Sequence, residues 1–187
     1  SIKCWRTRPH GTQSLRDAYN NSCNPSFIQL GRLIGTTTLY KYYDAFGFFE
    51  KTGISLSGEA SGIFFDIDDV GPVQLATMSF GQRFTITPLQ MITAAAAIAN
   101  DGVLLQPQIV ESMTNTDTGE VTIFETQEVR QVLSKETADT VASMMESVVT
   151  NGTGYRVKKD IDGMSQYSVG GKTGTSEPIH GSSDGYV

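Results

Sequence analysis

The segment from Thr87 to Gly102, TPLQMITAAAAIANDG, places the tightest limit on how this chain can fold. Thr87 and Gln90 have the spacing of a capping box, and Pro88 occupies the first helical position, where an N–H is not needed. Gly102 provides a stop at the other end. The apolar run 91–99 between these signals has the length and composition of a helix that packs against a core. This segment is therefore predicted to be a helix.

The remaining patterns predict one helix-rich α+β unit. Residues 50–80 are rich in Gly and Ser and are expected to form long irregular connections. Residues 103–133 alternate around Asp117-Thr118-Gly119, as a β-hairpin does. Further helices are expected over 11–21, from the N-cap Asn24 and Pro25 to Gly35, over 37–48 and over 134–152, followed by a strand over 166–177.

Charge and composition exclude several classes of protein. The net charge is −6 and the basic residues are scattered singly or in pairs, which disfavours nucleic acid as a partner. No stretch approaches the roughly 18–20 apolar residues of a membrane span. The chain opens at SIKCWRTRPHG, without an initiator Met or a signal peptide, and we expect it to be a fragment cut at both ends. Cys4 and Cys23, with His10 and His180, have no familiar zinc spacing, so neither a metal nor a cofactor is expected.

Two kinds of chemistry use a lysine among small residues, as in SVGGKTGTSE over 168–177. A phosphate-binding loop would need a glycine where Gln166 stands and a helix where GTSEPIHG follows. The alternative is a K-[TS]-G motif on a strand, which carries weight only with S-x-N upstream. Ser22-Cys23-Asn24 supplies that second motif at the break between two predicted helices.

With these motifs in place, the chain resembles the transpeptidase domain of class B penicillin-binding proteins. The resemblance covers nearly the whole chain and is carried by LRDAYNNSCNPSFIQLG, SFGQRFTITPLQMITAAAAIANDGVLLQPQIV and VGGKTGTSE. It implies the helix-rich part of the serine transpeptidase fold that these proteins share with β-lactamases, with the K-T-G segment as a strand. The nucleophilic serine of that family lies in S-x-x-K, and no lysine here has a serine three residues before it. We therefore expect residues 1–187 to be a partial transpeptidase domain that lacks the S-x-x-K segment.

The resemblance implies acyl transfer on the D-Ala-D-Ala end of a peptidoglycan stem peptide, which β-lactams imitate. Ser22 would relay a proton to the leaving nitrogen, Asn24 would hold the substrate amide, and Lys172 would supply positive potential. Each has a structural alternative: a loop hydroxyl for Ser22, a helix N-cap for Asn24, and a solvated surface cation for Lys172. Substrate binding would fall to Thr173, Gly174 and Thr175, with Gly174 admitting a substrate strand and Thr173 itself pointing away and packing.

The resemblance also implies a setting for the full-length protein. Its partners would be stem peptides, β-lactams and the cell-wall synthesis machinery. Its place would be the extracytoplasmic face of the bacterial membrane, with an N-terminal anchor. NSCNPSF most resembles the members that act in sporulation and cell elongation. A penicillin-recognising sensor domain, a β-lactamase and a D,D-carboxypeptidase remain alternatives of the same fold.

The two cysteines suggest a redox hypothesis. Disulfides form and persist outside the cytoplasmic membrane, where penicillin-binding proteins work. Cys23 lies inside the S-x-N motif, and Cys4 precedes the short helix that leads into it. A Cys4–Cys23 disulfide would tether Ser22 and Asn24 and could inactivate the full-length enzyme. The alternative is that the thiols are unrelated and that Cys23 packs as a small apolar residue.

The missing nucleophile generates the first prediction. The isolated chain should form no covalent adduct with a fluorescent penicillin, because losing a nucleophile costs on the order of 10⁶ in rate. Denaturing gel electrophoresis checks this prediction. A labelled band at the 20.3 kDa mass of the chain would contradict it.

Overall fold

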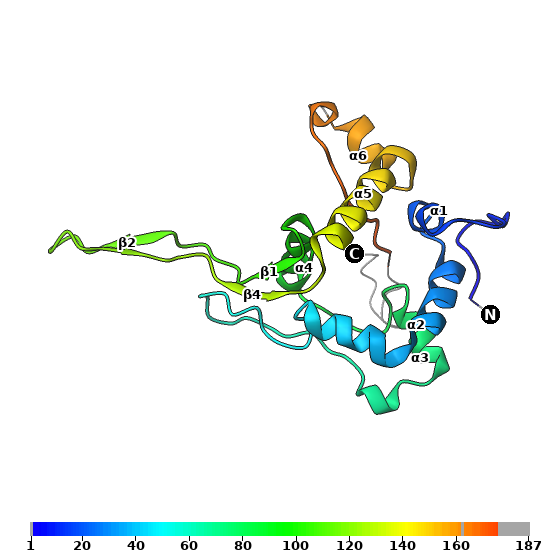
Figure 1. The fold of residues 1–187 in the computed structure, drawn as a ribbon, viewed down its shortest axis with the longest axis horizontal. Helices are drawn as coiled ribbons and strands as arrows, with labels where there is room; N and C mark the ends of the chain where they lie inside the picture. The colour runs from blue at the N-terminus through cyan, green and yellow to red at the C-terminus, as the bar shows by residue number, and fades with distance from the viewer. Residues whose placement is uncertain (1, 162, 176–187) are drawn as a thin grey trace, which may run out of the picture. The chain divides into compact units, whose positions relative to one another are not determined.

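The computed structural model describes residues 2–161 and 163–175, whose contacts divide the chain into two units (Figure 1). One unit comprises Ser1–Leu39, Phe65–Phe84 and Thr140–Val187, and the other Tyr40–Phe64 and Thr85–Asp139. We call them the first and the second unit. Both S-x-N and K-T-G belong to the first unit.

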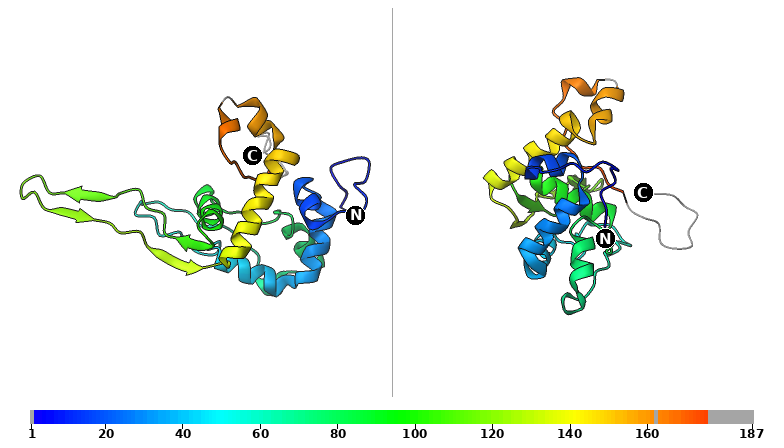
Figure 2. Two further views of the ribbon diagram at one scale, coloured as in Figure 1. Left: turned by 45° about the horizontal axis from the view of Figure 1, so that its top comes forward. Right: turned by 90° about the vertical axis from the view of Figure 1, so that its right-hand side faces the viewer.

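The first unit is helical in its described part. It contains α1 (Leu15–Asn20), α3 (Pro72–Met78), α6 (Tyr155–Asp160) and the short 3-10 turns Ile67–Asp69 and Met164–Gln166, together with parts of α2 (Asn24–Ala45) and α5 (Lys135–Asn151). A capping box between Ser14 and Asp17 starts α1. Figure 2 shows α6 following the C-terminal end of α5 after a short turn. Its buried apolar side chains, among the described residues, are those of Ala18, Cys23, Ile28, Ala76, Met78, Val148 and Val149.

Helix α2 bears out the predicted break at Gly35. Gly35 has φ 77° and ψ 166°, so two helical segments meet there at a kink. The start of α2 differs from the expectation by one residue. The carbonyl of Cys23 accepts from the N–H groups of Ser26 and Phe27 at 3.0 and 3.2 Å, which makes Cys23 the cap residue and Asn24 the first helical residue. The prediction of Asn24 as the N-cap is wrong.

The second unit contains the predicted capping-box helix, α4 (Pro88–Ala99). Both bonds of the Thr87–Gln90 box are present. The side chain of Gln90 is 1% exposed, and its amide also donates to the carbonyls of Phe48 and Glu50 at 3.1 and 2.8 Å. One side chain therefore caps the helix and pairs the backbone of a neighbouring loop, which explains how a polar group is buried here.

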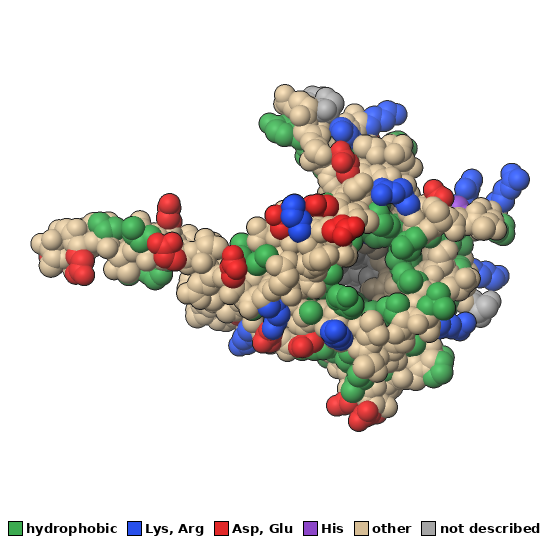
Figure 3. Space-filling model, viewed as in Figure 1, with side chains coloured by type: hydrophobic (Ala, Val, Ile, Leu, Met, Phe, Trp, Pro, Cys, Tyr) green, Lys and Arg blue, Asp and Glu red, His purple; other side chains and the backbone are tan. Residues whose placement is uncertain are grey.

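The predicted hairpin is confirmed as two short antiparallel pairs. Strand β1 (Val103–Leu105) pairs with β4 (Glu128–Gln131), and β2 (Ser112–Thr114) pairs with β3 (Val121–Ile123). Gly119 turns the chain between β2 and β3 with φ 74°. Figures 1 and 2 show β2 and β3 as a long two-stranded ribbon that continues from β1 and β4. Acidic side chains line this ribbon in Figure 3, and the sequence has no Lys or Arg over 106–129.

Two expectations about secondary structure are wrong. Residues 50–80 contain the helix α3. It has Pro72 at its first position, where proline is favoured, and it is only seven residues long. Residues 168–175, which contain the K-T-G motif, are not part of a β-strand in the described part of the chain. Residues 176 and 177 of the predicted strand lie outside the described residues. Within the described part of the chain, no helix combines the length and the apolar character needed to cross a bilayer.

Gly152 generates a prediction about stability. A Cβ at this position would lie 2.6 Å from the carbonyl oxygen of Asn20 and 2.9 Å from that of Val148, and neither backbone group can move aside cheaply. We expect Gly152→Ala to lower the free energy of unfolding by about 1–3 kcal/mol, the range for an overpacked site. Urea denaturation measures the effect. Gly171→Ala is the matched control, because its Cβ would meet nothing within 4 Å, and equal stability of the two variants would contradict the prediction.

Candidate functional site

The turn between α1 and α2 holds the S-x-N motif. The N–H of Cys23 donates to the carbonyl of Ala18 at 3.0 Å, and that of Ser22 to the carbonyl of Tyr19 at 3.1 Å. These bonds reverse the chain so sharply that Ser22 takes φ 49°, in the left-handed region. Non-glycine residues seldom adopt this conformation, and when they do it is often at a functional site.

The N-terminal end of the K-T-G segment lies along α5. The N–H of Gly171 donates to the carbonyl of Met145 at 3.1 Å, and the hydroxyl of Ser168 donates to the carboxylate of Glu146 at 2.8 Å. A Cβ on Gly170 would be 3.2 Å from the Cβ of Met145, so a glycine permits this close approach. The helix thereby fixes the point from which Lys172 extends.

Lys172 and Ser22 are in direct contact, although 150 positions separate them in the sequence. The ammonium Nζ of Lys172 donates to Oγ of Ser22 at 2.7 Å. It also lies 3.2 Å from the carbonyl oxygen of Thr173 and 5.8 Å from the centroid of the Tyr19 ring. Lys172 as a whole is exposed, but desolvation of the ammonium lowers its pKa below the ordinary value of 10.5. The first unit thus joins the two predicted motifs through one charged hydrogen bond.

Asn24 is half-buried one residue after the turn. Because Cys23 is the helix cap, the side chain of Asn24 is not occupied in capping. Its side chain makes no hydrogen bond to another residue in the described part of the chain.

The residues that follow Lys172 are exposed as far as Thr175. Thr173 does not pack as expected: it is exposed, and its hydroxyl lies 3.0 Å from that of the half-buried Thr153. A Cβ on Gly174 would meet nothing within 4 Å, so the space beside its backbone is open. An extended chain can approach a backbone of this kind closely.

Sequence reasoning missed three residues that position the site. The side chain of Asn20 donates to the hydroxyl of Ser147 at 2.9 Å, and its backbone carbonyl accepts from Thr153 at 3.0 Å. Tyr19 places its ring beside the ammonium of Lys172. Asn20 and Tyr19 come just before S-x-N in the sequence, which is a usable signal, whereas no local pattern marks Thr153.

The fold also brings Cys4 and Cys23 together with His10. One ligand atom from each of the three residues lies within 4.8 Å of the other two. Both cysteines are free thiols, with Cys23 buried and Cys4 half-buried. The redox pairing of Cys4 and Cys23 stays a prediction, and the proximity of His10 was not expected from the sequence.

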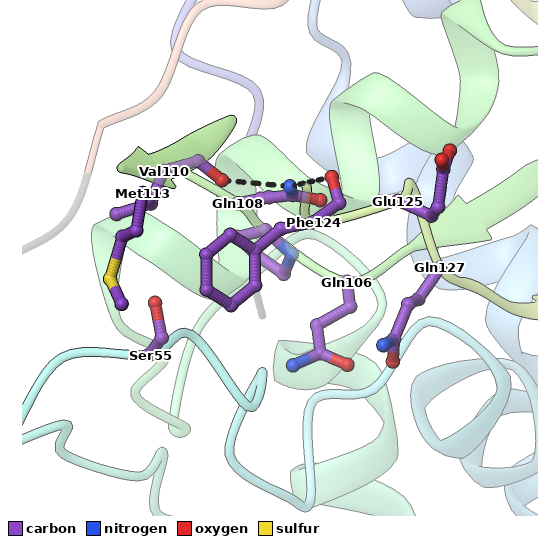
Figure 4. Close-up of a pocket in the computed structure, with 9 residues that line it drawn as sticks. Ser55, Gln106, Gln108, Val110, Met113, Phe124, Glu125 and Gln127 are labelled. Atoms are coloured by element: carbon purple, nitrogen blue, oxygen red, sulfur yellow. Dashed lines mark hydrogen bonds between the residues drawn. The ribbon is translucent and has the colours of Figure 1, made fainter. Parts of the chain in front are cut away.

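A separate pocket of about 300 Å³ lies in the second unit (Figure 4). Figure 4 shows the amide of Gln108 between the carbonyls of Val110 and Phe124, to which it donates at 2.8 and 2.6 Å. These bonds occupy the amide donors of Gln108, but the lining also includes the polar residues Ser55, Gln106, Glu125 and Gln127. None of the predicted site residues lines it.

The family can now be identified from the fold, the motifs and a family comparison. The family model for the penicillin-binding protein transpeptidase domain matches residues 1–187. The chain belongs to this family.

Two curated relatives are similar to the chain over most of its length. It is 40% identical to Stage V sporulation protein D of Bacillus subtilis over 95% of this chain and 27% of the relative. It is 30% identical to peptidoglycan D,D-transpeptidase PbpA of Mycolicibacterium smegmatis over 90% of this chain and 33% of the relative. The chain therefore spans about a quarter to a third of the length of these curated relatives.

Solved structures agree with the fold. The D,D-transpeptidase domain of a peptidoglycan glycosyltransferase from Eggerthella lenta superposes with a TM-score of 0.82 at 30% identity, over 96% of this chain and 46% of that domain. Penicillin-binding protein 3 from Mycobacterium tuberculosis, solved in complex with aztreonam, gives 0.81 at 29% identity, over 97% of this chain and 41% of that protein. These likenesses confirm the predicted helix-rich part of the transpeptidase fold.

The left-handed conformation of Ser22 generates a prediction about the turn. Ser22→Gly and Ser22→Ala both remove the hydroxyl, but only glycine adopts φ 49° without a Cβ clash. We expect the glycine variant to be more stable than the alanine variant by about 0.5–1 kcal/mol. Urea denaturation of both variants gives the comparison. An alanine variant as stable as the glycine variant would mean that the turn imposes no strain at this position.

Proposed function

We propose that the chain forms part of the active site of a serine-type peptidoglycan D,D-transpeptidase, in which Ser22 and Lys172 act as a pair. The hydrogen bond of 2.7 Å between Lys172 Nζ and Ser22 Oγ carries the proposal. It connects two short motifs from distant parts of the sequence, in the combination that serine acyl transferases of this family use. This contact favours the catalytic roles of Ser22 and Lys172 over the alternatives of a loop hydroxyl and a solvated surface lysine.

The pair suits proton transfer. In acyl transfer a serine attacks the amide carbon, an ester forms, and the leaving nitrogen must receive a proton as its bond to carbon breaks. Ser22 can accept a hydrogen bond from Lys172 and donate its own proton toward that nitrogen. Desolvation lowers the pKa of Lys172, so the lysine gives up a proton at less cost than a solvated lysine does. No lysine of this chain has a serine three residues before it, so we expect the attacking serine to lie outside residues 1–187.

The neighbouring groups suit a peptide substrate. Asn24 has an open amide that can both donate to and accept from a substrate amide. The open backbone at Gly174 allows an extended stem peptide to pair alongside the segment. The exposed Thr175 offers a hydroxyl and an N–H for the terminal carboxylate and the developing oxyanion, and Thr173 extends the same binding edge. The positive charge of Lys172 favours that carboxylate.

The biological setting follows from this substrate class. A stem peptide ending in D-Ala-D-Ala lies outside the cytoplasmic membrane, so the full-length protein would act there, anchored by an N-terminal segment and working with other cell-wall enzymes. β-Lactams would acylate it, as the aztreonam and ampicillin complexes of a structural relative suggest. The 40% identity with Stage V sporulation protein D supports a role in sporulation.

Deacylation separates this proposal from its alternatives of the same fold. A transpeptidase or a sensor domain stays acylated by penicillin, whereas a β-lactamase releases the product quickly. Transfer of the acyl group to an added amine then separates the transpeptidase from the sensor, and from a carboxypeptidase, which transfers it only to water. Slow deacylation of the full-length protein together with amine transfer is the expected result.

Lys172 generates the prediction that tests the proposal. In the full-length protein, Lys172→Ala should lower the rate of acylation by penicillin at least about a hundredfold, because it removes charge stabilisation and a proton-transfer partner. The melting temperature should change little, since the side chain is exposed. Stopped-flow or gel measurements of acylation check the rate. Lys159→Ala, which removes another exposed lysine of the first unit, is the matched control.

The pH dependence gives a second readout of the same variant. The folded protein holds the pKa of Lys172 below 10.5, so the lysine loses its charge as pH rises through that lower value. The rate at which penicillin acylates the wild type should therefore decrease as the pH rises, with a midpoint below pH 10.5. This decrease should be absent from Lys172→Ala. Acylation kinetics of the variant that match the wild type would remove Lys172 from the site.

A further inference from the structure

The cluster of Cys4, His10 and Cys23 contains three metal-binding side chains in one place. Their ligand atoms all lie within 4.8 Å of one another, and Sγ of Cys4 is 3.4 Å from Nδ1 of His10. All three residues belong to the first unit, and all are described by the structure. Two thiols and an imidazole are the ligands that zinc and other thiophilic ions prefer.

The distances suit a tetrahedral ion. With metal bonds of about 2.3 Å to sulfur and 2.0 Å to nitrogen, two such ligands at the tetrahedral angle are about 3.5 Å apart. The Cys4–His10 separation of 3.4 Å is already close to that value. Side-chain adjustment alone would bring Cys23, which is no more than 4.8 Å from either, into the same sphere.

A second observation concerns the other ring nitrogen of His10. The Nε2 atom of His10 is buried and has no hydrogen-bond partner among the described residues. A buried polar atom left without a partner is costly, and such cases in native structures call for an explanation such as a missing water or ion. His10 therefore has one nitrogen beside the thiol of Cys4 and a second that is unsatisfied, and rotation of the ring exchanges the two.

Neighbouring contacts hold the three residues in place. The indole N–H of Trp5 donates to the carbonyl of Asn21 at 2.8 Å, which fixes the N-terminal segment to the turn before α2. The ring of Trp5 also packs edge-on against His10, with centroids 6.1 Å apart. Cys23 is only 5% exposed and is fixed by its backbone bonds at the start of α2. A preorganised cluster of this kind loses little entropy when an ion binds.

The charges of the three ligands suit a divalent cation. The thiolate is the form of cysteine that binds metals. Two thiolates and a neutral imidazole would balance the charge of a divalent cation, so the occupied cluster would carry no net charge in its half-buried position.

We propose that Cys4, His10 and Cys23 form a binding site for a thiophilic metal ion, with Zn²⁺ as the representative ion. The fourth position of the tetrahedron would be open to water. Because Cys23 lies between Ser22 and Asn24, a bound ion would fasten the catalytic turn to the N-terminal segment. The same ion would protect both thiols from pairing as a disulfide. Metal binding itself does not depend on the proposed transpeptidase function.

Zinc binding by the reduced full chain, freed of metal with a chelator, tests the proposal. Titration against a chromophoric chelator should give one Zn²⁺ per chain. Cys4→Ser, Cys23→Ser and His10→Ala should each weaken binding at least about tenfold, the lower end of the loss seen when a metal site is perturbed. His180→Ala, which removes the other histidine of the sequence and lies outside the described residues, is the matched control and should bind as the wild type does.

Three further measurements on the wild type keep the test decisive if a variant folds poorly. In the wild type, Zn²⁺ at a hundredfold excess over its Kd should raise the melting temperature by about 5 °C or more. Co²⁺ in place of Zn²⁺ should give thiolate-to-metal charge-transfer absorption, and saturating Zn²⁺ should slow oxidation of the two thiols. No binding by the reduced wild type, unchanged binding in all three variants, or a Cys4–Cys23 disulfide that forms equally fast with Zn²⁺ would overturn the proposal.

Discussion

The hydrogen bond between Lys172 and Ser22 depends on the sharp turn between α1 and α2. That turn is possible only because the backbone of Ser22 enters the left-handed region, where Cys23 can donate back to Ala18. The strain of this conformation is offset by the contacts around it: Asn20 bonds to Ser147 and to Thr153, and both of these lie in the segment that also supports Lys172. A strained residue held by many partners is preorganised, which is how a catalytic hydroxyl can be fixed at little cost during the reaction.

The other half of the pair is positioned by small residues. Gly170 lies against Met145 and Gly152 lies against the carbonyl of Asn20, at distances that no larger residue allows without movement. Close backbone contacts of this kind fix Lys172 more tightly than long side chains would, because backbone groups have fewer alternative positions. The first unit thus uses a strained turn on one side and close backbone packing on the other to bring two charged or polar groups together.

The sequence was most informative where local physics decides the structure. The Thr87–Gln90 capping box, the kink at Gly35 and the turn at Gly119 all depend on residues within a few positions of one another, and all were predicted. The motifs around Ser22 and Lys172 were also recognised, because each is short and contiguous. Helix α3 was missed because seven residues give too few repeats of a helical period to stand out among Gly and Ser.

Features that depend on distant partners could not be predicted in the same way. Whether Lys172 lies on a strand depends on a neighbour for it to pair with, which its own residues do not specify. The spacing of Cys4, His10 and Cys23 in the sequence gives no sign of a cluster. The three residues meet because the N-terminal segment folds back on the turn before α2, where Trp5 donates to Asn21. The one-residue error at the start of α2 arose because Asn24 is a good cap residue placed directly after the actual cap, Cys23.

The ribbon formed by β2 and β3 has a consequence for how copies of this protein behave in solution. Each strand has only one partner among the described residues, so each leaves an outer edge whose N–H and C=O groups could pair with another chain. Exposed apolar side chains, among them Met113, Val121 and Ile123, would add to that attraction. The ribbon carries Glu111, Asp117, Glu120 and Glu125 and no basic residue, so two ribbons that met edge to edge would bring like charges together. At neutral pH this repulsion would oppose self-association through the exposed edges and apolar side chains of the ribbon.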